Sequence, residues 1–203
     1  ALPGWVLDFN SKNYATSYMQ GVWDTYYPIE TYTESGPDQS PYEHLFPGKT
    51  TPTFPYDLKQ IVESDTSVTA AGLFPYTPFA NTFLTDFALQ ALKNEQLGVD
   101  AQTDMLCISY STPDIIGHMF GPNSKEIEDT YIRLDKELER LIQELNKTVG
   151  KGDFVLFLTA DHAVVPVPQL LTDHNLPGGY FFQDTNFVLL GEKLTSKFGA
   201  NVV

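Results

Sequence analysis

MLCISY at residues 105–110 and FVLFL at residues 154–158 are the two segments that decide the fold, because each predicts a short buried strand. Between them, apolar residues recur at spacings of three and four and predict one long amphipathic helix. The positions of that stripe are Ile127, Tyr131, Leu134, Leu138, Leu141 and Leu145. A strand, a helix and a strand make a β-α-β unit, so we expect an α/β fold with parallel strands and a right-handed crossover.

Local signals bound the long helix and an earlier one. Asn123 and Glu126 form a capping-box-like start, and Gly150 ends the pattern. The earlier helix is expected over about residues 81–96, with Gly98 beyond its end. The sequence thus predicts residues 81–203 as a helix followed by the β-α-β core.

The first part of the chain, residues 1–80, has little periodicity. Pro3 fits the first turn of a short helix that includes Trp5 and Phe9. Residues 28–78 carry eight prolines among many aromatic residues, which favours ordered loops that pack on a surface. We therefore expect residues 1–203 to form a single partial domain, with an irregular, cap-like segment rich in Pro and aromatic residues at 1–80.

Composition excludes several functions. With 42% hydrophobic and 19% charged residues the chain is typical of a globular protein, and no apolar run reaches the length of a membrane span. The formal net charge of −14 argues against binding nucleic acid or anionic membrane. The single cysteine, Cys107, cannot form an internal disulfide and is expected to be a buried core thiol.

Each predicted strand is followed by one carboxylate and one imidazole. Asp114 and His118 follow the first strand, and Asp161 and His162 follow the second. Parallel strands of one unit end at the same edge of the sheet, so the four side chains are expected to converge there. Mixed oxygen and nitrogen donors suit zinc, would tolerate manganese or iron, and suit calcium or magnesium less well.

A single Asp–His pair arises often by chance, but two such pairs after the strands of one unit favour a metal site, because unpaired charges at that edge would be costly. The other histidines have structural interpretations. His174 lies in a predicted loop and His44 in the Pro-rich segment, and both are expected at the surface.

The residues around these positions resemble two signatures of the alkaline phosphatase superfamily. The first is DIIGHMFGPNS at residues 114–124 and the second is TADH at residues 159–162, with EIEDTYIRLD at residues 126–135 between them. Together with DTYYP at residues 24–28 and FP at residues 54–55, they resemble the single-chain bacterial phosphomonoesterases of the PafA type, near the nucleotide pyrophosphatase/phosphodiesterase branch.

The resemblance implies a zinc-dependent phosphate monoester hydrolase with two zinc ions a few ångströms apart. Asp114 and His118 would bind one zinc with a later His, and Asp161 and His162 the other with an earlier Asp and a Thr or Ser nucleophile. That nucleophile forms a phospho-enzyme in the family. A periplasmic or secreted location is also implied.

This chain departs from the family pattern. No Thr or Ser matches the nucleophile motif, and Ala163 stands where the family often has Gly. We therefore expect an internal piece of a longer enzyme that is inactive alone. Two alternatives stay open: a phosphodiesterase or nucleotide pyrophosphatase of the same superfamily, and a non-catalytic module that binds metal or a partner. Oligomeric state is not indicated.

Overall fold

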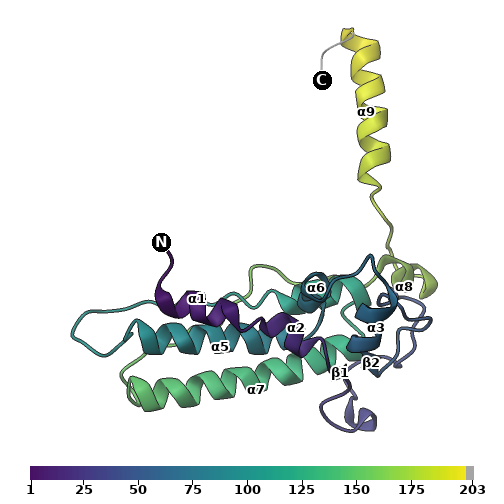
Figure 1. Ribbon diagram of the computed structural model, residues 1–203. Helices are drawn as coiled ribbons and strands as arrows, with labels where there is room; N and C mark the ends of the chain where they lie inside the picture. The colour runs from purple at the N-terminus through teal and green to yellow at the C-terminus, as the bar shows by residue number, and fades with distance from the viewer. Residues whose placement is uncertain (200–203) are drawn as a thin grey trace. The chain divides into compact units, whose positions relative to one another are not determined.

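The computed structural model describes residues 1–199, which divide into a compact unit of residues 1–165 and a second unit that begins at Pro166 (Figure 1). The first unit contains helices α1 (Gly4–Ser11), α2 (Tyr14–Tyr18), α3 (Leu58–Ser64), α4 (Ala70–Leu73), α5 (Phe79–Asn94), α6 (Thr112–Phe120) and α7 (Lys125–Thr148), strands β1 (Val22–Trp23) and β2 (Tyr56–Asp57), and the 3₁₀ helices η1 (Ile29–Thr31) and η2 (Phe74–Tyr76). The second contains α8 (Pro168–Asp173) and α9 (Gln183–Phe198). The helices described at residues 1–199 include none that is long and apolar enough to cross a membrane.

The two long predicted helices are present as α5 and α7, which pack side by side with α1 against α5 (Figure 1). The N-cap of helix α7 lies one residue after Asn123, the expected cap. Its N-cap is Ser124, whose Oγ accepts a hydrogen bond from the Ile127 N–H at 3.2 Å. Arg140 of α7 donates to Asp86 of α5 at 2.6 Å, so a charge-assisted bond supports the helix packing.

The two predicted strands are not part of a sheet in residues 1–199. Residues 105–110 and 154–158 have no ladder partner, and the sheet that is present pairs β1 with β2 antiparallel. Val155 and Phe157 are 78% and 88% exposed, and Cys107 is exposed rather than buried. A strand is held by hydrogen bonds to neighbouring strands and by a layer over its faces. The described residues supply neither to these segments, so the expected parallel sheet does not form here.

The core of the first unit is built from aromatic residues of the irregular region. Trp23 stacks on Tyr56 with ring centroids 5.1 Å apart, and Phe46 stacks on Phe120 of α6 at 6.2 Å. All four side chains are buried. The Pro-rich region is therefore ordered by packing on α6 and α7. Between residues 24 and 55 its one regular element is η1, and its role as a cap stays a prediction, as does the single-domain organisation.

Asp129 of α7 fastens this region to the helix. Its fully buried carboxylate accepts hydrogen bonds at 2.5–2.8 Å from four donors. The donors are Trp23 Nε1, the Tyr26 N–H, Tyr32 Oη and Arg133 Nε. Hydrogen bonds to an ionised group are stronger than neutral ones, and a buried carboxylate needs them.

We expect Asp129→Ala to lower the free energy of unfolding by about 3–5 kcal/mol, because Arg133 and two aromatic donors would lose their acceptor. Urea unfolding followed by Trp fluorescence measures the loss. Asp135→Ala on the exposed side of the same helix is the matched control and should change stability by less than about 0.5 kcal/mol. Equal effects in the two variants would contradict the role given to Asp129.

Candidate metal centre

Helix α6 carries the first predicted pair of ligands. Asp114 lies in its first turn and His118 in its last, four residues apart and therefore on one face. His118 Nε2 lies 3.6 Å from Asp114 Oδ1. The sequence placed this pair in the loop after a strand, whereas the structure extends a helix from Thr112, with Pro113 in its first turn, through both residues.

The second pair lies on the extended segment that follows residues 154–158. His162 Nε2 lies 3.7 Å from Asp161 Oδ2 and 3.6 Å from Asp114 Oδ1. Asp114 thus stands between the two imidazoles, at the same distance from each. The structure brings together all four of the predicted side chains, which come from positions up to 48 residues apart in the chain (162 − 114).

The spacing of these atoms can be tested against zinc geometry. Zinc binds His nitrogen and carboxylate oxygen at about 2.0–2.2 Å, so two ligands of a tetrahedral site lie roughly 3.3–3.6 Å apart. The Asp114–His118 pair at 3.6 Å is close to that spacing, and the Asp161–His162 pair at 3.7 Å is slightly wider. Among residues 1–199, however, no group of three or more His, Cys, Asp or Glu side chains is arranged to hold a metal ion. The donor chemistry fits zinc, and the ligand set within this chain is incomplete.

The site is open to solvent. The side chains of His118 and Asp161 are 80% and 90% exposed. The pKa of His162 is raised above its ordinary value, chiefly because Nδ1 of the protonated ring donates to Ala163 O at 3.0 Å, and further by the charges of Asp161 and then Asp114. The local field therefore favours a cation at this position.

The two remaining histidines are exposed, as expected. His174 is exposed, and its Nδ1 donates to Leu170 O at 2.8 Å at the end of α8. The exposed His44 donates its backbone N–H to Met119 O at 2.9 Å. In the part of the chain that the structure describes, no Ser or Thr hydroxyl is hydrogen-bonded to any of the four predicted ligands.

Comparison with known proteins identifies similar sequences. The model of the type I phosphodiesterase / nucleotide pyrophosphatase family matches residues 5–191. Alkaline phosphatase PhoV of Synechococcus elongatus is 47% identical over 178 residues, 88% of this chain and 31% of that protein. Alkaline phosphatase PafA of Elizabethkingia meningoseptica is 42% identical over 201 residues, 98% of this chain and 36% of that protein. The chain thus spans about a third of the length of these relatives.

The same similarity holds in three dimensions. The crystal structure of wild-type alkaline phosphatase PafA superimposes with a TM-score of 0.86 at 42% identity. The match covers 98% of this chain and 37% of the crystallised chain.

The arrangement around His162 predicts how its neighbours affect its titration. In the metal-free chain we expect Asp161→Asn and Asp114→Asn each to lower the pKa of His162, since the two carboxylates lie 3.7 and 3.6 Å from its Nε2. NMR titration of the imidazole protons measures both shifts. Asp8→Asn, in α1 and paired with Lys12, is the control and should leave the pKa of His162 unchanged. An unchanged pKa of His162 in both variants would contradict this arrangement.

Proposed function

The chain belongs to the type I phosphodiesterase / nucleotide pyrophosphatase family, and we propose that it is part of a zinc-dependent phosphate monoester hydrolase. Its fold is of the alkaline-phosphatase-like α/β type, since it superimposes on PafA with a TM-score of 0.86 at 42% identity. The resemblance of its motifs to the alkaline phosphatase superfamily is thereby confirmed. The convergence of Asp114, His118, Asp161 and His162 is the observation that carries the proposed activity.

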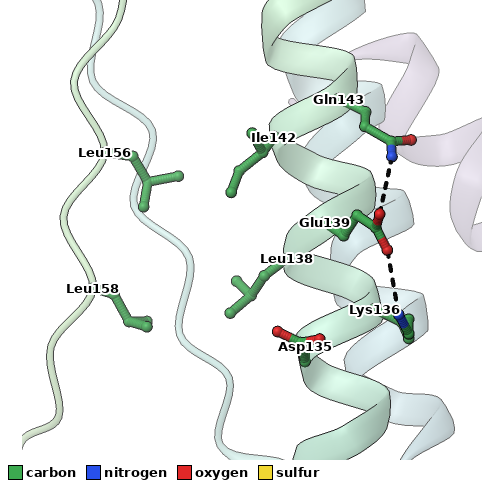
Figure 2. A pocket seen from close by; sticks show the side chains of 8 residues that line it. All are labelled: Asp135, Lys136, Leu138, Glu139, Ile142, Gln143, Leu156 and Leu158. Atoms are coloured by element: carbon green, nitrogen blue, oxygen red, sulfur yellow. Dashed lines mark hydrogen bonds and ion pairs between the residues drawn. The ribbon is translucent and has the colours of Figure 1, made fainter.

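We infer that residues 105–110 and 154–158 belong to a parallel sheet that is completed by chain outside these 203 residues. Leu156 and Leu158 point across a groove toward Leu138 and Ile142 of α7 (Figure 2). The groove has a volume of about 520 Å³ and is rimmed by polar residues of the helix. Ile142, Leu156 and Leu158 are exposed, and a contiguous apolar patch of this kind marks a surface that other protein covers. The Pro-rich segment at 1–80 would cover part of the completed domain as a cap.

In the proposed enzyme, the four side chains would hold two zinc ions. Asp114 and His118 would bind one ion, and Asp161 and His162 the other. When bound, zinc supplies positive charge that attracts a phosphate ester and stabilises the oxygens of the transferring phosphoryl group. A chain with net charge −14 needs such charge to bind an anion. The Thr or Ser nucleophile and the remaining ligands would come from outside this chain.

A phosphodiesterase or nucleotide pyrophosphatase is the second candidate, because the matching family model carries that description. Both activities would use the same four ligands. Comparing a phosphate monoester with a diester as substrates of the complete protein separates them. A periplasmic or secreted location is part of the proposal and rests on the resemblance alone.

We expect the 203-residue chain, purified alone, to hydrolyse p-nitrophenyl phosphate no faster than background, even with added zinc. Covalent phosphoryl transfer needs an activated nucleophile in line with phosphorus, and none is recognisable in this sequence. The assay is run beside His162→Ala. Zinc-dependent turnover that this substitution abolishes would mean that the chain contains its own nucleophile.

Zinc affinity tests the four ligands without any turnover. In the complete protein, competition with a zinc-binding dye should show Asp114→Asn weakening zinc binding by about tenfold or more, since Asp114 Oδ1 lies equally near both imidazoles. His44→Ala removes an exposed imidazole away from the site and is the control. Equal affinity of wild type and Asp114→Asn would contradict the metal site, and with it the proposed function.

A further inference from the structure

Two glutamates outside the site described above each have one buried carboxylate oxygen without a hydrogen-bond partner. Glu126, in the first turn of α7, is fully buried. Its Oε1 accepts a hydrogen bond from Tyr56 Oη at 2.6 Å, and its Oε2 is buried without a partner. Glu43, in the Pro-rich region, also has a buried Oε2 without a partner. A carboxylate oxygen with no donor is a costly group to bury.

The surroundings of this pair are acidic. Glu126 is the charge that acts most strongly on Glu43, and Asp38 acts on both. Asp129 also acts on Glu126, although its own carboxylate is paired with Arg133.

The nearest cations are engaged elsewhere. Lys49 Nζ donates to Pro55 O and lies 4.9 Å above the Tyr56 ring, while Lys125 Nζ donates to Tyr32 O and Ser35 Oγ. Within residues 1–199 no cation pairs with either glutamate. If both groups were ionised, the charge of Glu126 would act unfavourably on Glu43.

We propose that Glu43 and Glu126 are a proton-holding pair that fastens residues 36–57 to the start of α7. The contact is closed while the pair keeps a proton, and it weakens when both groups ionise and release their protons to water. The same segment is otherwise attached by the Gly36 N–H donating to Asn123 O at 2.7 Å and by the His44 N–H donating to Met119 O at 2.9 Å. It also carries Phe46, which is part of the buried core.

The pKa values of the two glutamates indicate the pH range in which this contact weakens. Burial raises the pKa of Glu126 to about 7, although the Tyr56 hydroxyl opposes this, and burial together with the charge of Glu126 raises the pKa of Glu43 to about 9. The folded state therefore keeps protons that the unfolded state loses near its ordinary value of 4.5. The stabilisation from these protons is fully present below the unfolded-state pKa. It is lost as the pH rises through the pKa values of Glu126 and Glu43 in the folded state. We expect the contact to open between neutral and alkaline pH.

Thermal unfolding of the whole 203-residue chain at about pH 6 and about pH 10 tests the pair. The wild type should lose about 5 °C or more of its Tm over this interval. Glu43→Gln should lose markedly less, because an amide keeps the shape and cannot ionise. Glu30→Gln removes one exposed acid and is the matched control for net charge, so it should behave as the wild type does.

Hydrogen exchange separates this contact from general alkaline destabilisation. In the wild type, the amides of Gly36 and His44 should exchange at least about tenfold faster at alkaline pH, after correction for intrinsic rates, than the amides in the middle of α5. If Glu43→Gln does not fold, the wild-type exchange pattern decides alone. A wild-type Tm that is flat with pH, or that added calcium or magnesium restores at about pH 10, would overturn the proposal. The second result would make the pair a cation site.

Discussion

The buried carboxylate of Asp129 accepts four hydrogen bonds, and the arrangement of the N-terminal region depends on it. Residues 22–33 lack enough regular structure to satisfy their own polar groups. They reach α7 through Trp23, Tyr26 and Tyr32, while Arg133 balances the charge from the next turn of the helix. Hydrogen bonds to a charge inside a low-dielectric core are strong and require a specific geometry, which apolar packing alone does not impose. The aromatic residues then fill the space around it.

The environment of helix α7 changes along its length. Its first turns are enclosed by the aromatic core, with Glu126 and Asp129 both fully buried. Farther along, Leu138 and Ile142 face Leu156 and Leu158 across an open groove (Figure 2). An amphipathic helix buries one stripe, and here that stripe is covered only in part, since Ile127 and Leu141 are buried whereas Tyr131 is exposed. The open part agrees with a chain that spans about a third of its relatives.

The candidate metal centre is formed by helix α6 and the segment that follows residues 154–158. Helix α6 contributes Phe120 to the core and presents Asp114 and His118 to solvent, so the core orients the ligands. The segment after residues 154–158 brings His162 to the same carboxylate. Opposite partial charges attract these groups even without an ion, while full coordination needs donors that the described residues do not arrange. The site is therefore prepared in part by local helix geometry and in part by packing.

The sequence by itself determined the long helices, the four candidate ligands and the family, because 3.6-residue periodicity and the two signatures depend only on neighbouring residues. It could not determine whether residues 105–110 and 154–158 enter a sheet, since a strand needs partners that lie elsewhere in the chain or outside it. Nor did it indicate that Asp129 would bind Trp23 and Tyr32, about a hundred residues away, or that Tyr56 would donate to Glu126. Only tertiary packing brings such distant polar groups together, because their pairing is decided by which of them are buried in the same place.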